Sequence, residues 1–232
     1  MTLIFWFFIF LIIYCYFGYP ALLWGIAKVR PCSVCKMYQE PAISVILSVW
    51  NEEDVLEKKI QNLLSLDYPN DRVEILIGSD GSTDRTNEIL LNIRDPRVYT
   101  IVAEKRRGKM ATINDLAKQA KNEIIIFTDA RQIFEPSAIR ELVANFSDPS
   151  VGCVSGELVF KKSDGATARG IGLYWNYEKF IRRQESYMHS MLGATGAIYA
   201  IRKRLFEPIP EHIVLDDVYL PLNIIRKGYR AI

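Results

Sequence analysis

The chain has 232 residues, half of them hydrophobic, and its 29 lysine and arginine residues nearly balance 27 aspartate and glutamate residues. A net charge of +2 gives no electrostatic case for binding nucleic acid, so we expect no nucleic-acid partner. With 24% charged and 12% aromatic residues, the composition is not that of a disordered chain either. No charged residue precedes Lys28. The sequence therefore divides into an uncharged N-terminal segment and a remainder long enough for one domain with a sizeable core.

The uncharged segment predicts a transmembrane helix. Leu3–Ala27 is almost continuously apolar and is longer than the roughly 20 residues that cross a bilayer. It lacks the basic start of a cleaved signal peptide and exceeds the usual apolar stretch of about 7–15 residues. A very apolar buried helix is the alternative. Lys28, Arg30 and Lys36 follow the run and no basic residue precedes it. This predicts a single-pass anchor at residues 1–27 in the cell (inner) membrane, with the following domain in the cytoplasm.

The four cysteines fit a reducing compartment. Cys15 and Cys153 lie in apolar runs, where we expect them to pack as small apolar side chains. Cys32 and Cys35 form a lone C-x-x-C pair, and a structural zinc site would need two further ligands. We therefore interpret this pair as an incidental part of a juxtamembrane linker over residues 28–41.

After the linker, apolar runs alternate with helical patterns. In chain order, the pattern predicts a strand at Ala42–Val49, a helix at Glu53–Leu66, a strand at Val73–Gly78, a helix from Ser82 or Thr83 through Ile93, a strand at Val98–Ala103, a helix at Met110–Ala120, a strand at Glu123–Thr128, and a helix from Pro136 to Phe146. Asn51 is a candidate cap for the first of these helices. The alternation predicts an α/β fold with a mostly parallel sheet covered by helices, in one domain over residues 42–232.

Ligands of such sheets bind at the carboxyl ends of the strands, so the residues that follow each predicted strand form the candidate site. They are Asn51 and Glu52, then Ser79 to Ser82, then Lys105 to Lys109, and then Asp129 to Arg131. This convergence of polar residues on one sheet edge carries more weight than any single motif.

The segment after the second strand reads S-D-G-S-T-D-R-T, over Ser79–Thr86. Asp80 offers a carboxylate that can accept hydrogen bonds from a base or from ribose hydroxyls. An ordinary strand-to-helix turn, with Asp80 or Ser82 as the cap, explains the same residues.

Two further strand ends carry charges that suit a diphosphate. In the segment Glu104–Asn114, basic residues surround Gly108 just before a predicted helix. Lys109 there is a candidate pyrophosphate ligand. A solvated basic loop is the alternative. Asp129 follows a very apolar strand and could ligate a divalent cation that bridges a diphosphate, or could cap a turn.

Asp216 and Asp217 are adjacent acids between apolar residues. Neighbouring carboxylates raise each other's pKa, which suits one of them to accept a proton as a general base. A negatively charged helix start explains the pair equally well.

Taken together, these segments resemble the family 2 glycosyltransferases, in particular the membrane-attached group that makes bacterial polysaccharides such as poly-N-acetylglucosamine, hyaluronan and cellulose. The matching pieces occur in the family's order over roughly Ser44 to Lys227 and read A-I-S-V-I-L-S-V-W-N-E-E, G-S-D-G-S-T-D-R-T, R-G-K-M-A-T-I-N, I-I-F-T-D-A-R, Y-W-N-Y-E-K-F-I-R-R-Q-E-S, G-A-T-G-A-I-Y-A-I-R and L-D-D-V-Y-L-P-L. The resemblance implies a GT-A fold, a nucleotide-sugar donor that is usually UDP-linked, a saccharide or lipid-linked acceptor, and inversion at the anomeric carbon.

The resemblance also implies roles by position. Asp217 matches the family's catalytic base, the second acid of a pair that Asp216 opens. The donor-binding positions are Asn51, Glu52, Asp80, Lys109, Asp129 and Arg131. Asp129 stands at the first acid of the D-x-D metal motif, which implies Mg²⁺ or Mn²⁺ as cofactor. The acceptor-lining positions are Gly193, Ala194, Thr195 and Gly196, and residues Glu178 to Glu185 match a helix beside them.

Two departures from the family pattern qualify these expectations. Arg131 occupies the position of the second D-x-D acid, so either Asp129 and the diphosphate hold the metal or Arg131 itself neutralises the leaving group. The sequence also ends at Ile232, where Gly228–Ile232 resembles the opening of another strand, before the Q-x-x-R-W motif of processive members. We therefore expect a C-terminally truncated sequence.

Two other functions remain open at this point. A non-catalytic or partner-dependent membrane scaffold of the same fold, working with a membrane partner subunit, would explain Arg131 and the missing motif. A sugar-nucleotide pyrophosphorylase would require a glycine-rich basic first loop, and residues 49–53 do not provide one.

Overall fold

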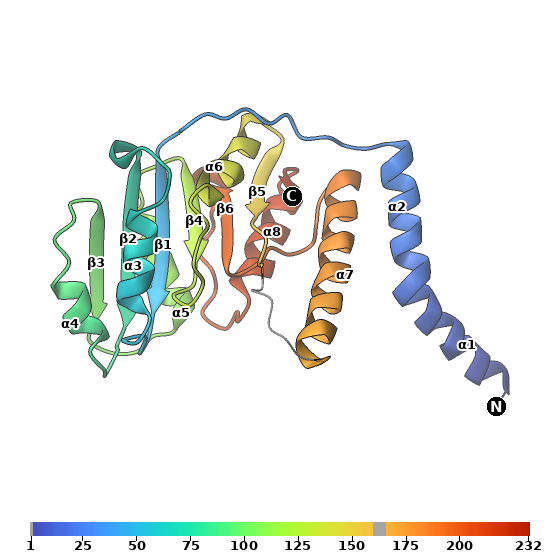
Figure 1. Cartoon of the computed structure of the whole chain (residues 1–232), viewed down its shortest axis with the longest axis horizontal. Helices are drawn as coiled ribbons and strands as arrows, with labels where there is room; N and C mark the ends of the chain where they lie inside the picture. Colours follow the sequence, from blue (N-terminus) through green and yellow to red (C-terminus); the bar gives the residue numbers. More distant parts are fainter. Residues whose placement is uncertain (1, 160–165) are drawn as a thin grey trace. The chain divides into compact units, whose positions relative to one another are not determined.

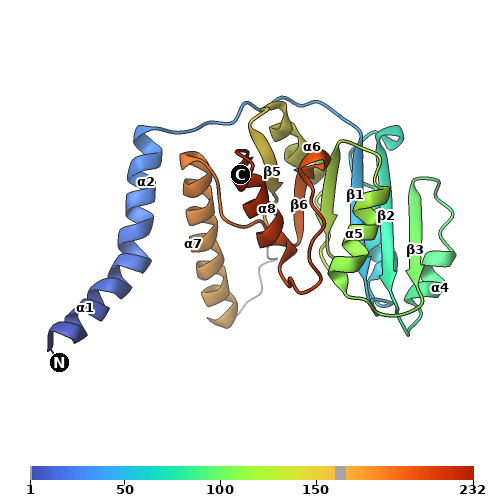
Figure 2. The same cartoon turned by 180° about the vertical axis from the view of Figure 1, so that it is seen from behind.

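A computed structural model describes residues 2–159 and 166–232, which form two compact units (Figures 1 and 2). One unit comprises Met1–Ser33, Val159–Leu192 and Ile232. The other comprises Val34–Leu158 and Gly193–Ala231, and it contains the sheet.

The sheet unit is built on seven strands in the order β3-β2-β1-β4-β6-β5-β7. Their bounds are β1 (Ile43–Val49), β2 (Val73–Asp80), β3 (Val98–Ala103), β4 (Ile124–Thr128), β5 (Val151–Ser155), β6 (Ile198–Arg202) and β7 (Arg230–Ala231). Among these seven strands of the described residues, β6 alone runs against its neighbours, since it pairs antiparallel with both β4 and β5. The predicted mostly parallel α/β sheet is therefore confirmed.

Helices cover both faces of this sheet, with α3 in front of it in Figure 1 and α5 in front of it in Figure 2. The helices of this unit are α3 (Leu56–Leu64), α4 (Thr86–Leu91), α5 (Lys109–Gln119), α6 (Ala138–Val143) and α8 (Asp216–Arg226), with short 3-10 helices η2 (Asn70–Arg72), η3 (Ala144–Ser147) and η4 (Lys203–Leu205). The central strands β1 and β4 are almost wholly buried, as their continuous apolar runs require.

The helices α3 and α4 begin later than their predicted starts at Glu53 and at Ser82 or Thr83. The two loops before them exchange hydrogen bonds: the Glu53 N–H donates to Asp84 Oδ2 at 3.1 Å, and the Arg85 N–H donates to Glu53 Oε2 at 2.8 Å. These bonds hold the two loops in a non-helical course and give their backbone N–H groups partners. The helix predicted from Pro136 to Phe146 is α6 followed by η3.

The carboxyl ends of the parallel strands lie level with one another. Val49 of β1 stands beside Ser79 of β2, and Leu47 stands beside Thr128 of β4. The chain moves outward from β1 to β2 and β3 and then returns to place β4 on the other side of β1. Because the loops after β1 and β4 turn to opposite faces at such a switch point, a crevice opens between them.

The second unit contains the N-terminal helix and α7 (Ala166–Met188). The N-terminal helix comprises α1 (Thr2–Ile13), a π-helical stretch η1 (Tyr14–Gly18) and α2 (Tyr19–Val29). Together these 28 residues make one helix that is long and apolar enough to cross a membrane. On these grounds of length and composition it is a candidate transmembrane helix.

Hydrogen bonds join α7 to the N-terminal helix. The Tyr177 hydroxyl donates to the Tyr16 carbonyl at 2.8 Å, and the Tyr19 hydroxyl donates to Glu185 Oε1 at 2.9 Å. Pro20 has no N–H to offer the Tyr16 carbonyl four residues before it, so the tyrosine hydroxyl takes that role. The predicted helix over Glu178 to Glu185 is therefore present as part of α7, while its place beside an acceptor stays a prediction.

Replacement of Gly81 by alanine tests the junction of the loops after β2 and β3. Gly81 has φ +65°, and a Cβ there would lie 2.4 Å from the Arg106 backbone nitrogen. We expect Gly81→Ala to lower the free energy of unfolding by about 1–3 kcal/mol, measured by thermal or denaturant unfolding. The control is Gly172→Ala on α7, where a Cβ meets nothing within 4 Å. Equal stability of the two variants would contradict the close approach.

Candidate functional site

A cavity of about 300 Å³ opens at the switch point between β1 and β4. Five of the predicted site residues, drawn from four different strand ends, line it together. Its full lining is Ser48, Val49, Trp50, Glu52, Asp80, Arg106, Lys109, Asp129, Ala130, Arg131 and Gln132. The prediction that residues after separate strands share one site is thus supported by the geometry.

Lys109 is the cation that joins the acids of this site. Its Nζ lies 3.2 Å from Asp129 Oδ1 and 3.0 Å from Asp216 Oδ1. Burial acts to lower the pKa of Lys109, but the charges of Asp216 and Asp129 outweigh it, and the net pKa is raised. The ammonium therefore stays charged between the end of β4 and the start of α8.

The adjacent acids at the start of α8 have different surroundings. Asp216 is buried, and its second oxygen accepts a hydrogen bond of 2.6 Å from the hydroxyl of buried Tyr199. Asp217 is half-buried, and its pKa is raised by burial first and then by the charge of Asp216, against the lowering effect of Lys109. Asp216 thus has its oxygens engaged, whereas Asp217 is the acid suited to accept a proton.

The predicted acceptor segment, residues 193–196, runs across the start of α8. The Ala194 N–H donates to the Asp217 backbone carbonyl at 2.7 Å, and the Thr195 N–H donates to Ser155 Oγ at 2.8 Å. A Cβ on Gly196 would lie 2.9 Å from Asp217 Oδ2 and 3.9 Å from Asp129 Oδ2, and a Cβ on Gly193 would touch Val218 at 3.3 Å. The glycine at 196 therefore leaves the space that lies against both carboxylates.

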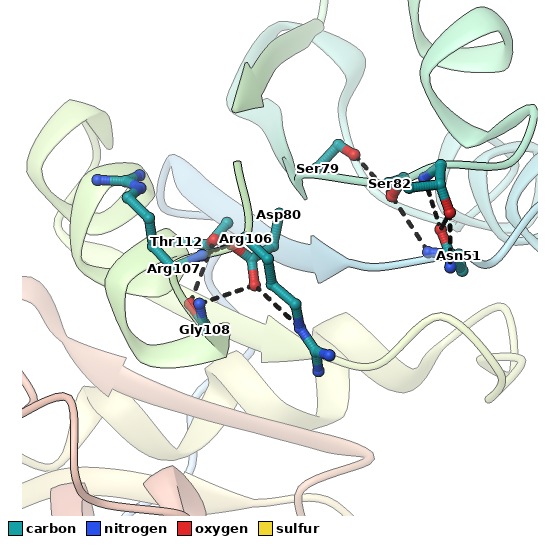
Figure 3. A network of polar contacts seen from close by, with 9 residues as sticks. Asn51, Ser79, Asp80, Ser82, Arg106, Arg107, Gly108 and Thr112 are labelled. Carbon is teal, nitrogen blue, oxygen red and sulfur yellow. Dashed lines mark hydrogen bonds and ion pairs between the residues drawn. The ribbon is translucent and has the colours of Figure 1, made fainter. Parts of the chain in front are cut away.

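Asp80 holds the basic loop in place, as Figure 3 shows. Its Oδ1 accepts the Arg107 N–H at 2.7 Å and its Oδ2 accepts the Gly108 N–H at 2.8 Å, while Arg106 Nε lies 4.0 Å from Oδ2. The carboxylate is 2% exposed and still borders the cavity. Its observed role is to position the loop that leads into Lys109, and direct contact with a nucleotide stays a prediction.

Asn51 does not take the capping role that the sequence suggested, and its contact with the donor stays a prediction. It does not cap α3, whose cap position is Val55, and it is not among the residues that line the cavity. Its Oδ1 accepts the Thr83 N–H at 2.8 Å, and its own N–H donates to Ser82 Oγ at 3.1 Å (Figure 3). Asn51, with φ +51°, thus ties the end of β1 to the loop after β2.

Arg131 and Glu52 form an ion pair at the exposed mouth of the cavity. Arg131 Nη2 lies 3.1 Å from Glu52 Oε1, and Arg131 Nε donates to both carboxylate oxygens at 3.2 Å. Both residues were predicted at the site, and the loops after β1 and β4 bring them together. The pair places a fixed guanidinium beside Asp129 at the position of the missing second acid.

Trp50 was missed by the sequence reasoning, and it pairs at the cavity with Arg106 of the predicted range Lys105 to Lys109. The guanidinium carbon of Arg106 lies 3.6 Å from the centroid of the Trp50 ring, and both side chains line the cavity. The available signal was an exposed tryptophan directly after a buried strand, since a large aromatic ring at a strand end is a frequent contact for planar ligands.

The acids present suit a divalent cation that a phosphate ligand helps to hold. Among the described residues no group of three histidine, cysteine, aspartate or glutamate side chains could hold a metal by itself. Asp129 has one oxygen on Lys109 and its other oxygen toward Gly196. Mg²⁺ is commonly bound by one or two carboxylates together with substrate phosphates and water, so Asp129 with a diphosphate fits such an ion.

Comparison with known proteins decides the family, because residues 44–209 match the model of Glycosyl transferase family 2. The chain belongs to this family. It is 34% identical over 194 residues to the poly-beta-1,6-N-acetyl-D-glucosamine synthase of Staphylococcus aureus strain MSSA476, covering 81% of this chain and 47% of that protein. It is 33% identical over 213 residues to the beta-monoglucosyldiacylglycerol synthase of Synechocystis, covering 88% and 43%. The chain thus spans less than half the length of these curated relatives.

A solved structure supports the same family and fold. The mannosyltransferase PcManGT from Pyrobaculum calidifontis, in complex with GDP-Man and Mn²⁺, matches with a TM-score of 0.80 and 26% identity. The match covers 94% of this chain and 63% of that one. The predicted GT-A fold and the predicted membership among the glycosyltransferases are therefore confirmed.

Gly196→Ala tests the space against Asp217 and Asp129. The added methyl must displace the Asp217 carboxylate, and a displacement of about 1 Å at a reacting group can cost up to roughly 100-fold in rate. We expect kcat for sugar transfer to fall by at least about tenfold, with donor KM changed little. Gly172→Ala on α7, where a Cβ meets nothing within 4 Å, is the control, and its kcat should match that of the wild type. A normal kcat in Gly196→Ala would argue against a reacting group at this position.

Proposed function

We propose that this chain carries the catalytic domain of an inverting glycosyltransferase that moves a sugar from a UDP-sugar donor to a saccharide or lipid-linked acceptor in the synthesis of cell-surface polysaccharide. The observation that carries the proposal is the convergence of Lys109, Asp129 and the acid pair Asp216-Asp217 at one edge of a GT-A sheet. This arrangement combines a diphosphate site with a half-buried proton acceptor, and sugar transfer from a nucleotide requires both.

The cavity suits the diphosphate of the donor. Lys109 and Arg106 line it, and Arg131 stands at its mouth. The helix α5 begins at Lys109, so its unpaired N–H groups and positive dipole end lie at the cavity edge. The exposed Trp50 ring, with Arg106 over it, offers a flat apolar surface for the base or the sugar.

Asp129 is the residue that would hold a Mg²⁺ or Mn²⁺ ion between the protein and the diphosphate. Such an ion supplies positive charge to the leaving nucleoside diphosphate when it is bound. The presence of Mn²⁺ in the complex of the related mannosyltransferase supports this assignment. Arg131 adds a positive charge at the position where the D-x-D motif has its second carboxylate. Arg131 and Lys109 would therefore help the metal ion to neutralise the negative charge of the diphosphate.

Asp217 is the proposed general base. Its raised pKa makes it a better proton acceptor than an ordinary aspartate, and its carboxylate lies directly against Gly196. An acceptor hydroxyl placed over residues 193–196 loses its proton to Asp217 as its oxygen forms the new bond to the anomeric carbon. The bond from that carbon to the diphosphate oxygen breaks on the opposite side, which inverts the configuration.

Asp216, although it was a candidate for catalysis, is better suited to positioning. Its oxygens hold Lys109 and the Tyr199 hydroxyl, and the side chain is buried. Asp216 fixes the Lys109 ammonium beside Asp129 and raises the pKa of Asp217 through its charge.

A membrane location fits the proposed acceptors. The apolar N-terminal helix is a candidate anchor, with Lys28 and Arg30 directly after its apolar part. Under the positive-inside rule these residues favour a cytoplasmic catalytic domain, on the side where nucleotide sugars are made. The named relatives make a sugar polymer and a glycolipid, respectively. Acceptors of both kinds, saccharide and lipid-linked, therefore agree with an anchored enzyme.

Asp217→Asn tests the proposed function. The amide cannot accept the acceptor's proton, so we expect transfer to fall by about 10²–10⁴-fold, while donor binding stays within a few-fold of wild type. Transfer is measured by release of nucleoside diphosphate. Binding is measured by titration calorimetry with UDP-GlcNAc and with GDP-mannose, each with and without Mn²⁺. Asp71→Asn, at an exposed carboxylate in η2, is the matched control.

Sugar transfer near the wild-type rate in Asp217→Asn would contradict the assignment of Asp217 as the general base. If the wild-type chain binds neither nucleotide sugar, with or without Mn²⁺, the proposed donor site is wrong as well.

Asp216→Asn should move the acid limb of the pH–rate profile. Asp217 works only when deprotonated, so the rate falls as the pH drops through its raised pKa. Removal of the neighbouring negative charge lowers that pKa, and activity then persists to lower pH than in the wild type. The measurement is kcat/KM against pH for both proteins. An unmoved or upward-shifted acid limb would contradict the assignment.

A further inference from the structure

A lysine lies in the core directly beneath the loop that carries Asp129 and Arg131. Lys59 of α3 has 0% of its side chain exposed. Its Nζ donates to Thr128 Oγ1 at 2.8 Å and to the Gln132 backbone carbonyl at 2.7 Å, and it lies 3.8 Å from the centroid of the Phe134 ring. The two hydrogen bonds hold the residue just before the loop and the residue just after Arg131.

This amine is costly to keep in the core. Burial lowers the pKa of Lys59 to about 7, against the opposing attraction of Asp129. Its contacts are a hydroxyl, a carbonyl and a ring, and no carboxylate of the described residues lies in direct contact with the charge. A position between Leu56 and Leu63 on the buried face of α3 would pack better with an apolar side chain. The two bonds to the loop are therefore what the amine contributes at this position.

Thr128 also connects Lys59 to a second segment outside the loop. The same Thr128 hydroxyl donates to the Ala197 carbonyl at 3.0 Å, and Ala197 directly follows Gly196. Lys59, Thr128 and Ala197 thus form a buried chain of hydrogen bonds from α3 across the end of β4 to the segment that lies against Asp217.

The far end of the loop also points to a ligand. Gln132 lines the cavity, and its buried Oε1 meets no hydrogen-bond donor among the residues that the structure describes. A buried oxygen without a donor is unfavourable, so a loop fixed in this conformation is better suited to a bound ligand than to the empty protein.

We propose that Lys59 is a positioning residue whose ammonium fixes the loop of Asp129 and Arg131 in the conformation that binds the donor diphosphate, and that fixes this loop against the acceptor segment through Thr128. The inference rests on the donor site of the proposed function. Lys59 itself lies beneath the cavity and does not line it. It acts on the donor through the backbone that it holds.

The test uses Lys59→Met in the full chain, because methionine keeps the unbranched stem and removes the ammonium. We expect the Kd for UDP-GlcNAc or GDP-mannose with Mn²⁺, from titration calorimetry, to rise at least about tenfold, with donor KM rising in parallel. The matched control is Lys203→Met, which removes a lysine-to-carbonyl bond to Ala120 at the opposite end of the sheet. Its donor Kd should stay within about twofold of wild type.

Thr128→Val keeps the test decisive if Lys59→Met does not fold, since valine is nearly isosteric and removes only the shared hydroxyl. We expect Thr128→Val to raise the donor Kd several-fold. In the double variant the two changes should be non-additive, because both remove the same contact. A wild-type Kd in folded Lys59→Met, or in Thr128→Val, would overturn the inference. Failure of the wild-type chain to bind either donor would instead overturn the proposed function.

Discussion

The site depends on one charge, the ammonium of Lys109 between Asp129 and Asp216. Three carboxylates converge at this edge of the sheet, and without a cation among them their mutual repulsion would favour protonation or displacement. Lys109 stands at the first residue of α5, on a loop that Asp80 secures through two backbone N–H groups. Asp80 at the end of β2 thus sets the position of the Lys109 amine. The amine in turn links Asp129 at the end of β4 to Asp216 at the start of α8.

The topology of the sheet determines where these groups meet. The chain reverses its direction of winding between β1 and β4, so the loops after those strands separate and leave a cavity. Level strand ends then bring Glu52, Asp80 and Asp129 to a common height. The polar residues lie where the backbone provides space and unpaired N–H groups. The proposed donor site is therefore a property of strand order as much as of side-chain identity.

Much of this could be predicted from the sequence, because buried parallel strands are continuous apolar runs and their ends are marked by polar residues. The strand over Val98–Ala103 was predicted at its observed bounds, and the site residues Glu52, Lys109, Asp129 and Arg131 share one cavity. What could not be predicted rests on contacts between distant segments. Helix starts moved because two loops bond to each other. The burial of Lys59 was not predicted, because its hydrogen-bond partners lie far along the chain. Asn51 was wrongly expected to cap the first helix for the same reason.

The antiparallel course of β6 has a consequence for how such enzymes can diversify. The strand β6 starts at the edge of the sheet where the parallel central strands end. The segment over residues 193–197 therefore comes before β6 in the chain, whereas each cavity-lining loop comes after its strand. The proposed donor side therefore comes from one continuous stretch of chain ending near Gln132, and the proposed acceptor side comes from a later one. Recombination or drift in the later stretch can exchange the acceptor while the donor half is inherited, provided that the contacts between the two stretches are kept. These contacts include the Lys109–Asp216 ion pair and the buried hydroxyl of Thr128.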